Sequence, residues 1–277
     1  PPRFTPIKSS AASDVYKRQA VERRKQILEQ VHKDKKVIVS ELSRQFRVSE
    51  ETIRRDLEKL AEDGHVIKSY GGAVINEIGS IDLPFNVRWK SNSIGKQKIA
   101  DLISQEIQDG EHIFLDASTT AVFIAKNIKN KKKLTVITNS IENLLELSDI
   151  SEWDIISTGG MLKGDSMSFL GVKAADSIEQ YNADKVFFSC KGLDIQKGVT
   201  EGNDETGCIK QSMIKSAKKV YLTVDSSKFD TVGFYNICPL SGLDVVVTDK
   251  KPDERWMQAF EENGIQCIYP KETGEAN

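Results

Sequence analysis

Basic and hydroxyl side chains recur at helical spacing within residues 48–64. Thr52, Arg55 and Lys59 lie at i, i+3 and i+7, and Arg54 lies beside them. Arginine and lysine side chains on one face of a helix can bind phosphates and base edges in the major groove of DNA. The spacing therefore indicates a candidate DNA-recognition helix.

The same stretch has the features of one capped helix. Ser49 stands at the N-cap position, where its hydroxyl can accept a hydrogen bond from a free backbone N–H, and Gly64 supplies the stop. Ile53, Leu57 and Leu60 recur at i, i+4 and i+7, which predicts an apolar stripe on another face. The helix would bury this stripe and offer its basic face to a ligand.

A simpler interpretation is that the charged residues only support an exposed helix. Glu50 stands four residues before Arg54, and Glu51 stands four residues before Arg55. This is the favoured order for stabilising i,i+4 ion pairs. The segments on either side decide between the two interpretations.

Two further helices are expected before this one, and a hairpin after it. Ile27, Leu28 and Val31 mark a helix over residues 21–33, and a brief helix, SELSRQF, begins at its expected cap, Ser40. The brief helix and the candidate recognition helix have the spacing of a helix-turn-helix.

The segment after the candidate recognition helix predicts the wing. Two β-prone arms in His65–Ile75 flank Gly71-Gly72, which indicates a hairpin. We therefore interpret residues 20–76 as a winged helix-turn-helix domain. Acidic and basic residues nearly balance within it, so DNA binding would depend on the placement of the charges and on dimerisation.

Small polar or charged groups follow five apolar, strand-like runs farther along the chain. These groups are Asp116-Ala-Ser-Thr-Thr120, Thr138-Asn-Ser140, Thr158-Gly-Gly160, Lys191-Gly192 and Asp225-Ser-Ser-Lys228. One such group is uninformative, because turns use these residue types anyway. Five at the same edge of a parallel sheet predict a site for a polyhydroxylated or phosphorylated small molecule.

The first of these groups opens a helix. The hydroxyls and backbone N–H groups of Ser118-Thr119-Thr120 can hold a phosphate, although an ordinary N-cap has the same composition. Gly159-Gly160 allows close approach of a ligand to the backbone. The sequence has no GxxxxGK[ST] pattern, so hydrolysis of a nucleoside triphosphate is not expected.

Alternating strand and helix patterns predict an α/β domain with a mostly parallel sheet over residues 94–271. The expected strands are 112–116, 134–138, 154–157, 185–190, 220–224, 245–248 and 266–269. The expected helices between them are 119–130, 141–148, 172–180, 205–217 and 253–263, after a first helix that ends near Gly110.

Bulk properties fit a soluble protein of about two domains. The 277 residues carry a net charge of −2, and no apolar run approaches the length of a membrane span. The four cysteines show no zinc spacing, so we expect a reduced, cytoplasmic protein without a metal or cofactor. Residues 1–19 are expected to be a disordered tail or a segment foreign to the fold, 77–93 a linker whose Leu83–Trp89 part packs on a domain, and 272–277 a tail.

The stretch VSEETIRRDLEKLAEDGHVIKSYGGAV resembles the DNA-binding domain of the DeoR family of bacterial transcriptional repressors. Thr52–Leu57 matches the TIRRDL recognition helix of that family, and Gly71–Ala73 matches the end of its wing. Lys68 and Tyr70 depart from the Arg and His common in the family, but both can reach a phosphate. The resemblance implies DNA contacts by Ser40, Ser49, Thr52, Arg54, Arg55, Lys59, Lys68, Tyr70, Gly71 and Gly72.

The resemblance extends over residues 94–249, where LDASTT, VITNS, TGGML, KGLD, GVT and VDSSKF follow the order of DeoR effector domains. Such domains resemble the ribose-5-phosphate isomerase and CoA-transferase fold and sense phosphorylated sugars. Ser118 replaces the usual Gly and would narrow the phosphate loop or add a hydroxyl. The implied effector contacts are Asp116, Ser118, Thr119, Thr120, Thr138, Asn139, Gly159, Gly160, Lys191, Gly192, Glu205, Lys210, Asp225 and Lys228.

The resemblance therefore implies a repressor of sugar or carbohydrate metabolism genes that binds operator DNA as a homodimer or homotetramer. A phosphorylated sugar would modulate its binding. One alternative is a sugar-phosphate isomerase joined to a DNA-binding domain, with Asp194 or Glu205 as general base. Another is a DNA-binding protein whose second domain binds no ligand.

Overall fold

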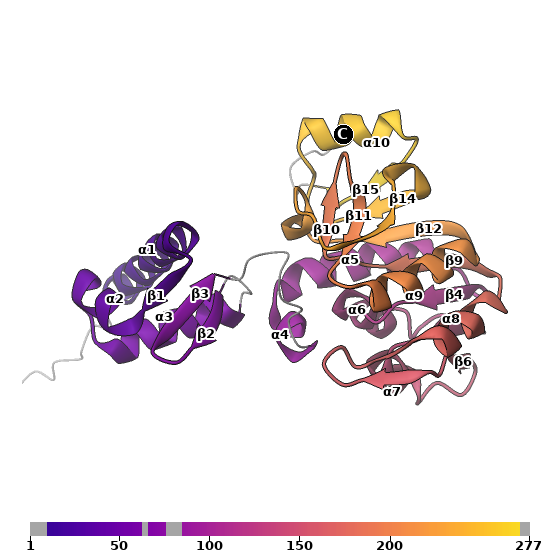
Figure 1. The fold of residues 1–277 in the computed structure, drawn as a ribbon, viewed down its shortest axis with the longest axis horizontal. Helices are drawn as coiled ribbons and strands as arrows, with labels where there is room; N and C mark the ends of the chain where they lie inside the picture. The colour runs from indigo at the N-terminus through magenta and orange to yellow at the C-terminus, as the bar shows by residue number, and fades with distance from the viewer. Residues whose placement is uncertain (1–9, 63–65, 76–84, 272–277) are drawn as a thin grey trace, which may run out of the picture. The chain divides into compact units, whose positions relative to one another are not determined.

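The computed structural model describes residues 10–62, 66–75 and 85–271 (Figure 1). The chain divides after Asn76 into two compact units, residues 1–76 and 77–277. Each unit has its own hydrophobic core. None of the described helices is long and apolar enough to cross a membrane.

The described part of the first unit contains three helices and a three-stranded antiparallel sheet. Its elements are α1 (Ser10–Asp34), β1 (Lys36–Ile38), α2 (Val39–Phe46), α3 (Glu50–Glu62), β2 (Val66–Ser69) and β3 (Gly72–Ile75). The sheet has the order β1-β3-β2, so β2 and β3 form the expected hairpin and β1 extends it. The winged helix-turn-helix predicted for this unit is confirmed, while Gly64 lies outside the described residues.

The first helix begins earlier than the sequence analysis predicted. Residues 10–19, expected to be disordered, form the beginning of α1, and residues 1–9 lie outside the described part of the chain. This part of the tail contains Ala, Lys, Arg and Gln, which favour a helix even where no apolar periodicity marks a buried face.

The expected cap of the second helix is also corrected. Helix α2 begins at Val39, and its N-cap residue is Ile38, without a side-chain cap. The backbone N–H of Val39 instead donates to the carbonyl of Gly71 in the wing turn, at 2.9 Å. Because the wing satisfies this first N–H, Ser40 lies inside the helix and is not its cap.

The wing depends on a close approach between two backbones. Gly71 has φ +79°, a conformation that favours glycine in a tight turn. A methyl group at Gly72 would lie 2.0 Å from the carbonyl oxygen of Val37 in β1. Glycine at this position therefore lets β3 pair with β1.

We expect Gly72→Ala to lower the free energy of unfolding of the first unit by about 1–3 kcal/mol, because β1 must move to admit the methyl group. Urea titration followed by far-UV circular dichroism measures this loss. Gly164→Ala is the control, since a methyl group there meets nothing within 4 Å. Equal stability of the two variants would contradict the close packing of the wing.

The second unit is built on a seven-stranded parallel sheet with the order β15-β14-β12-β9-β4-β5-β6. Its strands are β4 (His112–Leu115), β5 (Thr135–Thr138), β6 (Asp154–Ser157), β9 (Ala183–Phe188), β12 (Ala217–Thr223), β14 (Val245–Val247) and β15 (Gln266–Ile268). These correspond to the seven expected strands, so the predicted parallel sheet is confirmed.

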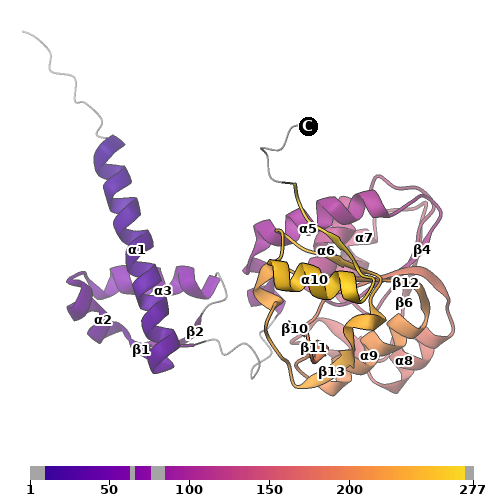
Figure 2. The same ribbon diagram turned by 90° about the horizontal axis from the view of Figure 1, so that it is seen from above.

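Helices cover both faces of this sheet. They are α4 (Phe85–Lys90), α5 (Ser93–Glu106), α6 (Thr119–Asn127), α7 (Ile141–Leu147), α8 (Val172–Glu179), α9 (Asp204–Lys215) and α10 (Glu254–Glu262). Helices α8 and α9 lie side by side in both views (Figures 1 and 2). Helix α4 falls in the stretch expected to be a linker, so that expectation is wrong for residues 85–90, whereas the expected packing of this segment on a domain is confirmed.

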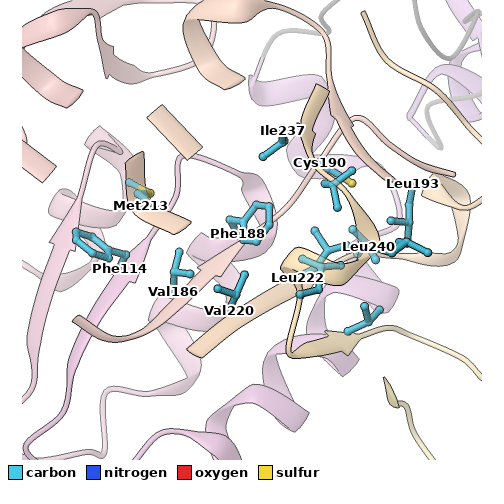
Figure 3. Packing of buried hydrophobic residues seen from close by; sticks show 14 of the residues in the cluster. Phe114, Val186, Phe188, Cys190, Leu193, Met213, Val220, Leu222, Ile237 and Leu240 are labelled. Atoms are coloured by element: carbon cyan, nitrogen blue, oxygen red, sulfur yellow. The ribbon is translucent and has the colours of Figure 1, made fainter. Parts of the chain in front are cut away.

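Strand side chains alternate between two cores. Phe114 packs in the core that contains residues of α8, α9 and α10, whereas Ile113 and Leu115 pack with residues of α5 and α6. Figure 3 shows the first core, where Phe188 and Leu222 from neighbouring strands lie among the buried side chains. This alternation fixes which residues reach the carboxyl ends of the strands.

Two small antiparallel sheets were not anticipated from the sequence. The hairpin β7 (Met161–Lys163) and β8 (Ser168–Leu170) follows β6, and β10 (Gly192–Asp194), β11 (Gly198–Glu201) and β13 (Tyr235–Cys238) form the other sheet. Both leave the large sheet from its carboxyl edge, after β6 and β9. They therefore add residues to the edge where polar groups were expected.

Candidate DNA-binding surface and effector site

Helix α3 has the two faces that the sequence predicted. Ile53, Leu57 and Leu60 are buried in the core of the first unit. Ser49 accepts a hydrogen bond from the backbone N–H of Thr52 at 3.2 Å, which confirms it as a cap, and its hydroxyl lies 2.9 Å from that of Thr52. The apolar stripe therefore fixes the helix, and the remaining side chains are left for a ligand.

The basic face of α3 is exposed and only weakly held by its own acids. Arg54 pairs with Glu50 at 3.2 Å, and Arg55 pairs with Glu51 at 3.3 Å. The Arg55 side chain is 77% exposed. Such exposed i,i+4 pairs contribute about 0.3–0.5 kcal/mol, so a DNA phosphate or base edge can replace the glutamates at little cost. Lys59 is also exposed on this helix.

Asp56 has a structural role that the sequence analysis missed. Its side chain is buried on α3 and accepts a hydrogen bond from Nε of Arg23 at 2.5 Å, and Arg24 lies 3.6 Å away. Both arginines belong to α1. The carboxylate thus joins the recognition helix to the first helix. Although Asp56 follows the exposed Arg54 and Arg55 in the sequence, its side chain is engaged inside the unit.

The wing supplies exposed groups at its tip and along its edge. Tyr70 is fully exposed at the turn, and Lys68 pairs with Glu58 of α3 at 3.1 Å. Gly71 and Gly72 build the turn and its packing, as described above. Of the expected DNA contacts in the wing, the two side chains are therefore available to a phosphate, while the glycines position them.

The switch point of the large sheet lies between β4 and β9. From β4 the chain adds β5 and β6 on one side, and then returns to add β9 on the other side of β4. Ligands of open α/β sheets bind at such points. The buried Asp116 follows β4 there and accepts hydrogen bonds from the backbone N–H groups of Ser118 and Ser189, each at 3.0 Å. It joins the loops that follow the two strands.

Lys210 of α9 completes a buried ion cluster at this point. Its ammonium group donates to the carboxylate of Glu201 and to the carbonyl of Ser189 at 2.8 Å, and lies 3.5 Å from Asp116. Burial alone would lower the pKa of Lys210, but the charges of Glu201 and Asp116 outweigh it and raise the pKa above its usual value. Lys210 therefore remains charged.

Residues 118–120 form the first turn of α6. The Ser118 side chain caps the helix by accepting from the backbone N–H of Ala121 at 3.1 Å, and its φ of −78° needs no glycine. Thr119 and Thr120 are buried in the same turn. The Ser118 hydroxyl therefore accepts from one backbone N–H group of the turn, that of Ala121, and the loop is not strained.

The loop after β5 is bonded to the loop after β4. Thr138 donates to the carbonyl of Leu115 at 2.7 Å, and the side-chain amide of Asn143 donates to the carbonyl of Asp116 at 3.0 Å. The side-chain amide of Asn139 donates to Phe169 at 3.1 Å. The buried side-chain oxygens of Asn139 and Asn143 have no hydrogen-bond partner within the described part of the chain. Asn143 was missed, because a polar residue within a helix gives no distinctive signal.

A second charged group lies after β12. Asp225 is buried and accepts from the backbone N–H of Ser227 at 3.0 Å. Burial would raise the pKa of Asp225, but Lys228 and the hydrogen bonds of Ser227 lower it. Lys96 of α5 lies in the electric field of both residues. Burial lowers the pKa of Lys96 to about 8, although Asp225 partly opposes this shift.

Some expected effector contacts serve the fold itself. A methyl group at Gly192 would lie 2.3 Å from the carbonyl oxygen of Thr231, and one at Gly160 would lie 2.7 Å from that of Leu170. Gly159 has a positive φ of +59°. Glu205 pairs with Lys163 of β7 at 2.9 Å on the surface, and the backbone N–H of Lys191 donates to Thr200 at 3.0 Å.

A cavity of about 500 Å³ lies elsewhere in the second unit, lined by His112, Trp153, Asp154 and Tyr181 among others. His112 and Asp154 begin β4 and β6, so this cavity lies at the amino ends of the strands. It takes no part in the carboxyl edge that carries the ion cluster. Among the residues described, no group of three or more His, Cys, Asp or Glu side chains is placed to hold a metal ion.

The two units define a class of protein: a winged-helix DNA-binding domain followed by an α/β domain with a polar site at its switch point. The DeoR-like helix-turn-helix domain family matches residues 23–78, and the DeoR C terminal sensor domain family matches residues 91–250. The chain therefore belongs to the DeoR family of transcriptional regulators.

Two relatives from Bacillus subtilis extend over nearly the whole chain. The uncharacterized HTH-type transcriptional regulator YulB is 39% identical over 88% of this chain and 95% of its own length. The HTH-type transcriptional repressor GlcR is 31% identical over 89% of this chain and 95% of its own length. A ribose 5-phosphate isomerase from Methanocaldococcus jannaschii aligns with 48% of this chain and 53% of its own, at 16% identity and a TM-score of 0.36, a likeness too partial to bear on the site.

We expect Lys210→Met to destabilise the second unit by about 3–5 kcal/mol, because it leaves Asp116 and Glu201 as buried carboxylates without their cation. Chemical denaturation measures the change. Lys215→Met, at an exposed position of the same helix, is the matched control. A loss below about 1 kcal/mol relative to that control would contradict the ion cluster as the tie at the switch point.

Proposed function

We propose that this protein is a repressor of carbohydrate metabolism genes whose binding to operator DNA is modulated by a phosphorylated sugar. The observation that carries the proposal is the pairing of an exposed basic helix face with a polar, cation-bearing strand edge in one chain. The first feature suits the DNA major groove. The second suits an anionic, hydroxylated small molecule.

The DNA-binding part of the proposal requires more than one copy of the chain. Arg54 and Arg55 each pair with a glutamate of the same helix, so one recognition helix supplies few net phosphate contacts. A symmetric dimer doubles these contacts and fixes their spacing on paired half-sites. We therefore propose that the protein acts on DNA as a homodimer or homotetramer.

The effector part rests on three sets of groups at the carboxyl edge. The first turn of α6 offers the backbone N–H groups and hydroxyls of Thr119 and Thr120. Lys228, beside Asp225, supplies a positive charge from the loop after β12. The buried amide oxygens of Asn139 and Asn143 are acceptors that hydroxyl groups or water can satisfy.

Binding rather than catalysis is proposed, because the two carboxylates considered as a general base are otherwise engaged. Asp194 accepts from the backbone N–H groups of Gln196 and Lys197, at 2.9 and 2.8 Å. Glu205 is paired with Lys163. Conversion of ribose 5-phosphate to ribulose 5-phosphate that disappears in Asp194→Asn would contradict the proposal.

We expect Arg55→Ala to weaken specific DNA binding roughly 100-fold in a dimer, since a base contact contributes about 1–3 kcal/mol and each half-site loses one. Fluorescence anisotropy with a duplex selected from a random pool by the unaltered protein measures the affinity at several salt concentrations. Lys25→Ala, an exposed cation of α1, is the control. Unchanged affinity and footprint for Arg55→Ala would rule out α3 as the recognition helix.

A thermal-shift panel tests the effector. We expect one of ribose 5-phosphate, glucose 6-phosphate, fructose 6-phosphate or a related phosphosugar to raise the melting temperature, and Lys228→Ala to reduce that rise by removing a cation from the site. Lys197→Ala, at an exposed turn position, should respond like the unaltered protein. If no compound stabilises the protein, the second domain is not a phosphosugar sensor.

A further inference from the structure

Helix α4 (Phe85–Lys90) is the first described element of the second unit after the unit boundary at Asn76. Only residues 77–84 separate it in the chain from the DNA-binding unit. Helix α4 is short, and its contacts with the rest of the second unit include the three that follow. Each contact leads to a segment of the candidate effector site.

The first contact is aromatic and leads to the first turn of α6. The rings of Trp89 and Phe123 stack with centroids 4.6 Å apart, and the ammonium group of Lys126 lies 4.6 Å from the Trp89 ring centroid. Phe123 lies one helical turn after Thr119 and Thr120. The Trp89 ring is therefore in contact with the same helix whose first turn belongs to the candidate effector site.

The second contact is a backbone hydrogen bond to the β7–β8 hairpin. The N–H of Phe85 donates to the carbonyl of Asp165, between the two strands, at 3.0 Å. At the base of the same hairpin, Asn139 and Phe169 exchange two hydrogen bonds, from the side-chain amide of Asn139 at 3.1 Å and from the N–H of Phe169 at 2.8 Å. The hairpin thus joins the loop after β5 to the start of α4.

The third contact is a buried cation at the other end of α4. The ammonium group of Lys96 donates to the carbonyls of Arg88, at 2.5 Å, and of Ser91. The charged groups that act on Lys96 are Asp225, Lys228 and Arg88. Two of these belong to the loop after β12, so added negative charge in that loop changes the field at the lysine that holds α4.

We propose that α4 is the coupling element of this regulator: an anion bound at the α6 turn and the Asp225–Lys228 loop changes how α4 docks, and α4 passes the change along the chain to the DNA-binding unit. This inference rests on the proposed effector function. An effector acts on DNA binding only if it favours one of two states of the protein. The three contacts give α4 a docked arrangement whose stability depends on the occupied site.

Hydrogen exchange of the full chain, read by mass spectrometry with and without glucose 6-phosphate, tests the coupling directly. We expect a several-fold change in exchange rate in peptides covering residues 85–91 as well as in residues 118–124. A change at 118–124 alone would show binding without coupling and would overturn the inference. No change in either peptide with any phosphosugar of the panel would contradict the proposed function, and the coupling with it.

A matched pair of variants tests the consequence for DNA. Trp89→Ala removes the stacking contact, whereas Asn86→Ala changes an exposed residue of the same helix. We expect Trp89→Ala to keep the thermal shift given by the effector but to lose most of the effector-induced change in operator affinity. Asn86→Ala should keep both. An effector response of DNA binding in Trp89→Ala equal to that of Asn86→Ala would overturn the coupling through α4.

Discussion

A single buried cation holds the candidate effector site together. Lys210 of α9 binds Glu201 and lies beside Asp116, which in turn accepts N–H groups from the loops after β4 and β9. These loops follow β4 and β9, the paired strands on either side of the switch point. Because an unpaired carboxylate inside a protein is costly, the cluster keeps the polar ends of the two loops together. The ligand-facing loops depend on that tie.

A buried ion pair also joins two elements of the DNA-binding unit. Buried Asp56 bonds to Arg23 of α1, and the apolar stripe of α3 fills the remaining contact. Packing and the ion pairs of Asp56 fix the helix from one side, whereas Arg54 and Arg55 are held by weak pairs with neighbouring glutamates. The buried charged residue of α3 thus serves the fold, and the exposed charged residues remain available for function. Within TIRRDL, Asp56 stabilises the fold of the unit, and the adjacent side chains of Arg54 and Arg55 are available to DNA.

Periodicity was sufficient to predict the seven strands and the stripe of α3, because buried faces impose regular spacing on apolar residues. Contacts between distant segments left no such trace. The wing carbonyl of Gly71 displaced Ser40 from the cap of α2, and nothing near Ser40 indicates that neighbour. Lys210 and Glu205 were both expected to contact the effector. Lys210 is buried in an ion cluster, whereas Glu205 pairs with Lys163 on the surface. The sequence did not indicate that Glu201, Asn143 and Lys96 lie at or beside the candidate effector site, because single polar residues in buried positions have no periodic signature.

Weak individual DNA contacts would suit the proposed regulation. If each recognition helix bound DNA strongly by itself, an effector would have to oppose many kcal/mol to release it. For the proposed dimer or tetramer, affinity would come from two half-sites presented together, and a change of about 3 kcal/mol in how they are presented would alter binding roughly 150-fold. The contacts of α4 with the effector-site segments include an aromatic stack, a backbone hydrogen bond and a buried ammonium group. Because these contacts end at the segments where the anion is proposed to bind, one bound anion can change how α4 docks.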